Sequence, residues 1–158
     1  MKNVQVRSLV FLALISINCN AQTFQVKVVK ISDGDTFVGI NSDTLQIKFR
    51  LLGIDAPEKK QAFSTKSKNH LSSLIYDKVI TVKVEKQDKW GRYLVYAYTP
   101  DMRDVSLEML KAGMAWHFVR YSDSEEYQEA ENLARKKKVG LWSEPNQIEP
   151  WNYRRKND

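Results

Sequence analysis

Apolar and polar side chains alternate along residues 24–28, which is the pattern of a strand with one buried face. The apolar phase shifts by one position at Val29, and such a shift predicts a β-bulge. Two further apolar runs, at 36–40 and 44–52, predict a second and a third strand, and turn-forming residues stand before each of them. We therefore expect the chain to begin with three strands joined by tight turns.

The pattern changes to a helical period over residues 63–75, where apolar or small side chains recur every three to four positions. The remaining predicted elements are strands at 80–85 and 94–98, a helix at 105–112, and a last helix that begins at Ser122 and ends at Gly140. The last helix is expected to bury Tyr127, Ala130, Leu133 and Ala134. This order of elements is typical of an α+β fold. Five strands with an inserted helix suit a five-stranded OB-type β-barrel with three α-helices.

Residues 1–21 have the three-part pattern of a secretory signal peptide: basic residues, a short apolar run at 9–17, and small residues before a cleavage site after Ala21. The run is too short for a stable membrane span. We expect an exported domain, periplasmic or extracellular, that comprises residues 22–158. A buried N-terminal helix is the alternative, although no polar helical face accompanies the run. Acylation of Cys19 is a second alternative, ranked lower because Asn18 is a poor residue before an acylated cysteine.

The net charge falls from +6 to +4 on cleavage, because the segment contains two basic residues, Lys2 and Arg7, and no acidic one. Cys19 is the chain's one cysteine, so the expected mature domain has neither a disulfide nor a thiolate metal site. Two histidines argue against a histidine-rich zinc site. A basic exported domain has polyanions as natural partners, or carries its charge for solubility.

Four acidic side chains stand at predicted turns or strand ends rather than on helix faces: Asp33, Asp35, Asp55 and Glu58. Grouped carboxylates repel one another unless a cation joins them, and oxygen ligands without histidine or cysteine favour calcium or magnesium. Arg50 lies out of phase with the apolar positions of its strand, so it faces away from the core. Taken alone, the Asp33–Asp35 pair and the Asp55–Glu58 pair each also fit an ordinary turn.

Three segments together resemble the staphylococcal nuclease (thermonuclease) family: DGDT at 33–36, RLLGIDAPE at 50–58 and DKWGR at 88–92. The resemblance continues through 112–122 and 140–142, so it covers essentially all of the expected mature chain. The fold of that family is the five-stranded OB barrel with three helices that the hydropathy pattern predicts. The resemblance implies a calcium-dependent nuclease that hydrolyses DNA and RNA and leaves 3′-phosphate and 5′-hydroxyl ends.

The resemblance also implies residue roles. Asp35, Asp55 and the carbonyl oxygen of Ala56 correspond to the calcium ligands. Glu58 corresponds to the general base, and Arg50 and Arg92 correspond to the arginines that hold the phosphate in the catalytic step. Carboxylates, calcium and arginine forks are coherent with phosphoryl chemistry, which depends on positioning and charge stabilisation.

Substrate contacts are expected from Lys89, Trp90 and Tyr121, with single-stranded nucleic acid preferred and a monomeric enzyme. Trp90 stands where the staphylococcal enzyme has a tyrosine. Phe118 and Val119 fall in the region where the staphylococcal enzyme has another tyrosine, which contacts a phosphate. The alternative function is a catalytically silent OB domain that binds nucleic acid. Such relatives have lost the acidic and arginine positions, which this chain keeps.

Two basic stretches outside these motifs have structural explanations. Residues 135–138 end a helix whose first half is acidic, an arrangement that matches the helix dipole. The tail at 150–156 mixes aromatic and basic residues, and we expect a solvated terminus there, with contact to nucleic acid as the alternative. The two histidines, His70 and His117, are expected at the surface or at its boundary.

Overall fold

The computed structural model describes residues 22–157. The expected signal peptide and Cys19 lie outside the described residues. The strands are β1 (Gln22–Ile31), β2 (Thr36–Ile40), β3 (Gln46–Leu51), β4 (Ile54–Asp55), β5 (Val79–Gln87), β6 (Tyr93–Tyr98) and β7 (Trp116–His117). The helices are α1 (Ser64–Ile75), α2 (Val105–Lys111), α3 (Glu125–Lys136), the 3₁₀ helix η1 (Gly140–Ser143) and α4 (Pro150–Asn157). Between residues 22 and 157, no helix has the length and apolar character needed to cross a membrane.

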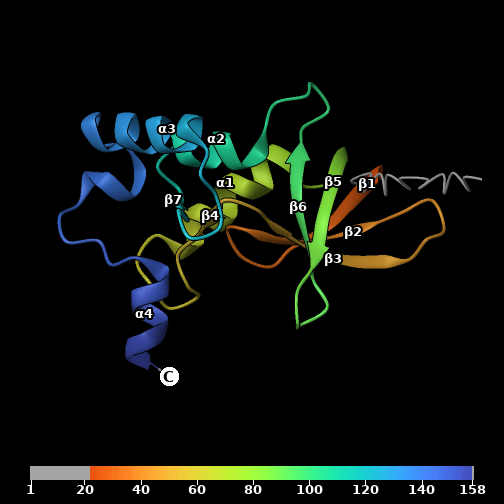
Figure 1. The fold of residues 1–158 in the computed structure, drawn as a ribbon, viewed down its shortest axis with the longest axis horizontal. Coiled ribbons are helices and arrows are strands. Elements are labelled where there is room, and N and C mark those ends of the chain that lie inside the picture. The colour runs from red at the N-terminus through yellow and green to blue at the C-terminus, as the bar shows by residue number, and fades with distance from the viewer. Residues whose placement is uncertain (1–21, 158) are drawn as a thin grey trace, which may run out of the picture.

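Five strands form a closed barrel in the order β1-β2-β3-β6-β5, which confirms the predicted OB-type barrel (Figure 1). Neighbouring strands are antiparallel except β3 and β6, which are parallel and pair Arg50 with Leu94. The register of β1 against β2 shifts between Val28 and Lys30, so the predicted bulge is confirmed. Strands β4 and β7 form a separate two-stranded sheet, which the sequence did not predict.

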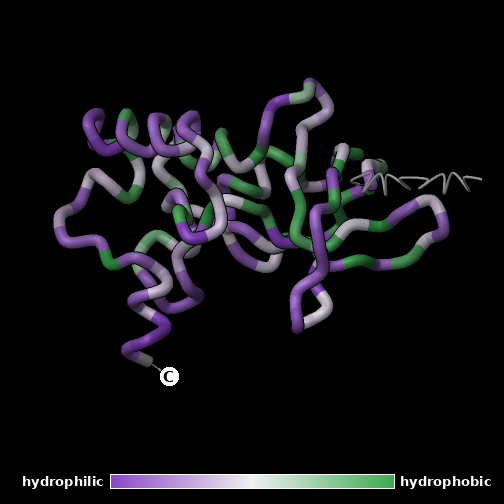
Figure 2. Tube along the Cα trace, in the orientation of Figure 1, coloured by the Kyte–Doolittle hydropathy of each residue, from purple (hydrophilic) through white to green (hydrophobic). Residues whose placement is uncertain are grey.

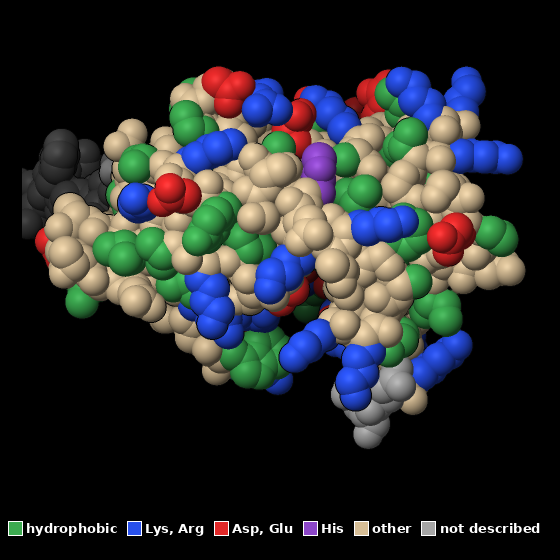
Figure 3. All heavy atoms as spheres, turned by 180° about the vertical axis from the view of Figure 1, so that it is seen from behind, with side chains coloured by type: hydrophobic (Ala, Val, Ile, Leu, Met, Phe, Trp, Pro, Cys, Tyr) green, Lys and Arg blue, Asp and Glu red, His purple; other side chains and the backbone are tan. Residues whose placement is uncertain are grey.

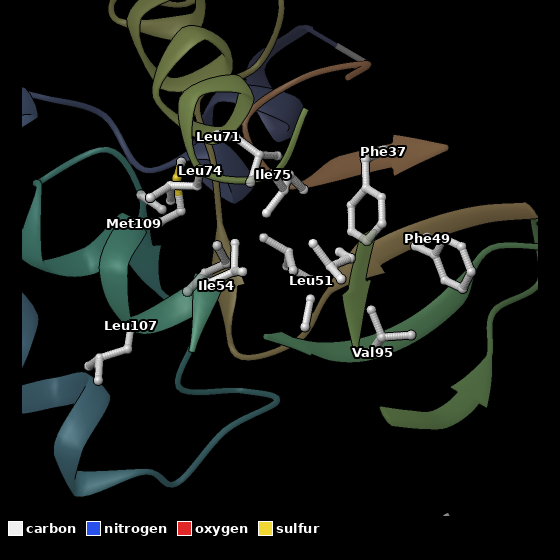
Figure 4. Packing of buried hydrophobic residues seen from close by; sticks show 14 of the residues in the cluster. Phe37, Phe49, Leu51, Ile54, Leu71, Leu74, Ile75, Val95, Leu107 and Met109 are labelled. Carbon is white, nitrogen blue, oxygen red and sulfur yellow. The ribbon is translucent and has the colours of Figure 1, made fainter. Parts of the chain in front are cut away.

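The barrel is filled by alternate side chains of its strands, with α1 and α2 covering one end (Figure 4). Phe37 and Phe49 stack on each other with ring centroids 5.2 Å apart. Phe49 and Leu51 are fully buried, whereas Arg50 between them faces the opposite side of β3. Hydrophobic stretches follow the barrel strands, and α4 is largely hydrophilic (Figure 2). The out-of-phase position predicted for Arg50 is therefore confirmed.

The helices keep their predicted order, but their details differ from the expectation. Helix α1 buries its predicted stripe at Ser67, Leu71, Leu74 and Ile75. Helix α3 begins at Glu125 and is capped by Ser124, not Ser122, because the Ser124 hydroxyl accepts the Tyr127 N–H. Leu133 is exposed, and Glu131 takes the buried position, where its carboxylate accepts the backbone N–H of His117.

Three further expectations were wrong. Strand β3 begins at Gln46, because the Asn41 side chain accepts the N–H of Leu45 and keeps that residue in an exposed turn. His117 is buried rather than at the boundary. The tail is not a free solvated terminus: it forms a fourth helix, α4, beside the loop after β4 (Figure 1). The described residues therefore form four α-helices, where three were predicted.

The turn between β1 and β2 packs tightly against α1 because its central residue is a glycine. A Cβ atom on Gly34 would lie 1.9 Å from the Ser67 hydroxyl oxygen and 2.7 Å from the Cβ of Ala56. The absence of a side chain at position 34 therefore lets Asp33 and Asp35 approach both α1 and the segment after β4.

We predict that Gly34→Ala lowers the free energy of unfolding by about 1–3 kcal/mol, the usual cost of overpacking a tight contact. Urea denaturation measures the change. Ser67→Ala removes the closest clashing atom, so the double variant should be less destabilised than the sum of the two single variants. Strictly additive effects would show that the two residues do not meet.

Candidate active site

Pairing between β2 and β3 brings the first acidic motif to the strand arginine. Thr36 pairs with Arg50, and the backbone N–H of Leu51 donates to the carbonyl of Asp35 at 2.8 Å. After β3 the chain turns through Gly53, which has a φ of 74°, and immediately forms β4. Asp55 ends that strand, so two acidic residues 20 positions apart in sequence flank the same arginine.

The guanidinium of Arg50 joins these two carboxylates. Its Nη1 donates to Oδ1 of Asp35 at 2.5 Å, and its Nη2 donates to Oδ1 of Asp55 at 2.7 Å. The exposed fractions of the side chains are 4 % for Asp35, 1 % for Asp55 and 17 % for Arg50. Two buried carboxylates thus lie within the span of one arginine fork, a geometry that gives strong, charge-assisted hydrogen bonds.

Backbone and hydroxyl donors fix the remaining acceptors of Asp35. The Thr36 hydroxyl donates to Oδ1 at 3.0 Å, and the backbone N–H of Ala56 donates to Oδ2 at 3.0 Å. The buried Ala56 is therefore tied to Asp35 through its amide. The Asp33 side chain accepts the backbone N–H of Asp35 at 3.1 Å and closes the turn. The carboxylates are held in place before any ligand binds.

Burial dominates the electrostatics of the acidic side chains. Burial raises the pKa of Asp55, and so does the charge of Asp35, although the bonds from Arg154 and the charge of Arg50 oppose this rise. Burial and the nearby charge of Asp35 raise the pKa of Asp33 to about 7. Burial alone would lower the pKa of Arg50, but the charges of Asp35 and Asp55 raise it above its ordinary value. The site holds more negative than positive charge in a desolvated place.

Glu58 lies at the edge of this group, with 37 % of its side chain exposed. The side-chain oxygen of Gln61 accepts the backbone N–H of Glu58 at 3.0 Å. The Glu58 carboxylate accepts a hydrogen bond from Arg154 of α4, which also donates to Asp55. Arg154 therefore links the carboxylates of Asp55 and Glu58, as Arg50 links those of Asp35 and Asp55.

Sequence reasoning missed Arg154. The available signal was Pro150 at the first position of a short helix, with Trp151 and Arg154 spaced to share one face. That signal does not say where the helix docks. The contact joins residues 99 positions apart, and only the folded chain defines it.

The third motif forms the hairpin between β5 and β6, and its hydrogen bonds among the described residues lie within the hairpin itself. Arg92 donates through Nε to Asp88 at 2.8 Å. It precedes Leu94, the partner of Arg50, by two residues and lies just before β6 begins at Tyr93. Lys89 and Arg92 lie 4.6 and 5.2 Å from the ring centroid of Trp90, whose ring is largely exposed.

Tyr121 is exposed in the turn after β7 and belongs to an aromatic group that reaches α4. Its ring meets Phe118 edge-on at 4.8 Å, and Phe118 stacks on Trp151 with ring centroids 5.1 Å apart and an interplanar angle of 2°. Figure 3 shows carboxylate atoms set in from the surface and bordered by lysine and arginine side chains. The structure thus brings Asp35, Arg50, Asp55 and Glu58 together, with the Trp90 hairpin and Tyr121 outside this group.

The donor set is suited to a hard cation. Asp35, Asp55 and the backbone carbonyl of Ala56 offer oxygen only, and calcium completes its coordination with carbonyl and water oxygens. In the described part of the chain, no three histidine, cysteine, aspartate or glutamate residues gather as a metal cluster. The two carboxylates, with their excess negative charge, are compatible with calcium when carbonyl and water oxygens complete its coordination.

Comparisons with known proteins identify the family of the chain. The profile described as "Staphylococcal nuclease homologue" matches residues 48–144. An "Uncharacterized endonuclease" of Haemophilus influenzae is 39 % identical over 154 residues, which cover 98 % of this chain and 86 % of that protein. A "Micrococcal nuclease" of Shigella flexneri is 37 % identical over 144 residues, which cover 84 % of this chain and 81 % of the relative. The chain belongs to the staphylococcal nuclease family.

Proposed function

We propose that this protein is an exported, calcium-dependent nuclease that hydrolyses phosphodiester bonds of DNA and RNA and leaves 3′-phosphate and 5′-hydroxyl ends. The observation that carries the proposal is the convergence of Asp35, Arg50, Asp55 and Glu58 at one end of the barrel. These side chains come from separate turns and strands, and a fold alone has no need to concentrate them. Nuclease names among the relatives support the same reaction class.

Asp35, Asp55 and the carbonyl of Ala56 would hold calcium, which supplies positive charge where the phosphate becomes more negative in the transition state. Arg50 can bind a phosphate oxygen because its guanidinium has five N–H donors and the two carboxylates hold it in a fixed orientation. Arg92 would bind a second oxygen, as the resemblance of its DKWGR motif to the family implies. The two forks would stabilise the charge of the pentacoordinate phosphorus.

Glu58 would act as the general base. Its carboxylate takes a proton from a water molecule as that water attacks phosphorus, and the bond to the 5′ oxygen of the leaving strand breaks. The leaving oxygen gains a proton from solvent, which gives a 5′-hydroxyl and a 3′-phosphate. The partial exposure of Glu58 keeps it in reach of water, while its backbone N–H is fixed by Gln61.

The exposed rings of Trp90 and Tyr121 would stack on bases of single-stranded substrate, and Lys89 would contact a phosphate. The signal-peptide pattern of residues 1–21 supports export. A monomer suffices for this activity, because every proposed ligand, base and arginine comes from one chain.

Our first functional prediction is that the purified protein digests single-stranded DNA only when calcium is present, and that the new ends carry 3′-phosphates. End-group analysis of the fragments checks the product, and a chelator checks the metal. Products with 5′-phosphates, or full activity in chelator, would contradict the proposal. Binding of DNA without cleavage would support the silent binding domain instead.

The second functional prediction concerns the arginine forks. Arg50→Lys and Arg92→Lys should each lower kcat by about 10²–10³-fold, because a point charge replaces a fork that stabilises the transition state. Arg103→Lys is the matched control, since Arg103 is exposed and pairs with Asp101 and Glu108. Near-normal turnover in either Lys variant at 50 or 92 would refute the assigned role.

The third functional prediction concerns the base. Glu58→Gln should lower kcat by about 10²–10⁴-fold, the usual contribution of general-base catalysis, while the far-ultraviolet circular dichroism stays that of the parent. The fold should survive because the side chain is partly exposed in a loop. A Gln variant that cleaves DNA at the parent rate would remove Glu58 from the mechanism.

A further inference from the structure

Helix α4 places one arginine directly on a proposed metal ligand. Nη2 of Arg154 donates to Oδ2 of Asp55 at 2.7 Å, and Nη1 donates to Oδ1 at 3.2 Å. The same Nη1 donates to Glu58. A tail segment thus contacts both a proposed calcium ligand and the proposed base.

Both oxygens of Asp55 accept hydrogen bonds from arginine side chains. Oδ1 accepts from Arg50 and Arg154, and Oδ2 accepts from Arg154. Formally, Asp35, Asp55 and Glu58 carry three negative charges, and the two guanidinium groups supply two positive ones. Without Arg154, Arg50 would be the one arginine bonded to this group among the described residues.

The docking of α4 is specific but shallow. Trp151 stacks on Phe118, and the side-chain amide of Gln61 donates to the carbonyl of Ile148 just before the helix. From Trp151 to Lys156, no side chain is buried. The contacts described for this helix include one ring stack, one amide bond and the ion pairs of Arg154, with Pro150 buried at its first position. Because the side chains of 151–156 are at least partly exposed, we expect the helix to undock at a lower cost than the barrel strands.

A cation that coordinates Asp55 would approach the same two oxygens to which Arg154 donates, and two positive groups that close together repel each other. We propose that Arg154 is a tethered counter-ion that competes with calcium for Asp55, so that α4 weakens calcium binding and undocks when calcium takes the site. This inference rests on the proposed function, and it adds a residue that controls how much calcium the enzyme needs.

The test is calorimetric titration of calcium into the metal-free protein and into its Arg154→Gln variant. We expect the variant to bind calcium about tenfold more tightly, since charge-assisted hydrogen bonds of this kind are lost from the competing state. In chelator, the melting temperature of the variant should fall by a few degrees, because the carboxylates lose a counter-ion. At saturating calcium, the two melting temperatures should agree.

The matched control is Arg155→Gln, which removes the same charge from the next position of the same helix. Arg155 is exposed and donates to Asn152, so its loss should leave the calcium affinity unchanged. Trp151→Ala is a second route to the same end. It removes the stack on Phe118, undocks α4 without touching a charge, and should also tighten calcium binding.

The outcomes separate the inference from the proposed function. If the parent binds calcium and cleaves DNA, but Arg154→Gln binds calcium equally or more weakly, the competition is overturned and the function stands. Equal tightening in Arg154→Gln and Arg155→Gln would show a general charge effect and would also overturn the inference. If neither the parent nor any variant binds calcium, the proposed function and the inference both fail.

Discussion

Two carboxylates buried side by side are the constraint on which this site depends. Removing ionised groups from water is costly unless a cation and several donors compensate them. Arg50 provides that compensation from a barrel strand, because its side chain faces away from the core and reaches Asp35 and Asp55 together. The turn at Gly34, the pairing of β2 with β3 and the tight exit into β4 all serve to keep this distance short. The shape of one barrel end is therefore set by charge as much as by packing.

Much of the fold could be predicted from the sequence, because the signals are local and strong. Alternation over five segments defines the barrel strands, and the phase shift at Val29 marks the bulge. The errors arose where side chains override the pattern. The Asn41 side chain accepts the N–H of Leu45 and keeps this residue in a turn. In α3, hydrogen bonds from His117 and Arg135 stabilise Glu131 in a buried position, whereas Leu133, which was expected to be buried, is exposed. A hydropathy pattern does not reveal either of these side-chain hydrogen bonds.

The candidate site likewise has residues that the sequence predicts and one that it does not. Asp35, Arg50, Asp55 and Glu58 stand in short motifs at strand ends, so the strand order brings them together once the barrel closes. Strand register does not fix the side chain of Arg92, because this residue precedes β6, and no described contact joins it to the carboxylates. Arg154 could not be predicted, because its contacts depend on how a short helix docks against residues that precede it by 96 to 99 positions in the sequence.

The placement of α4 has a practical consequence for anyone who attaches another sequence to this protein. A purification tag or fusion partner joined after Asp158 would extend from the helix that touches Asp55, next to the proposed site. The start of β1 lies on the other side of the molecule, where the barrel strands end (Figure 1). A tag that replaces residues 1–21 would therefore leave the surroundings of Asp55 as the native chain builds them.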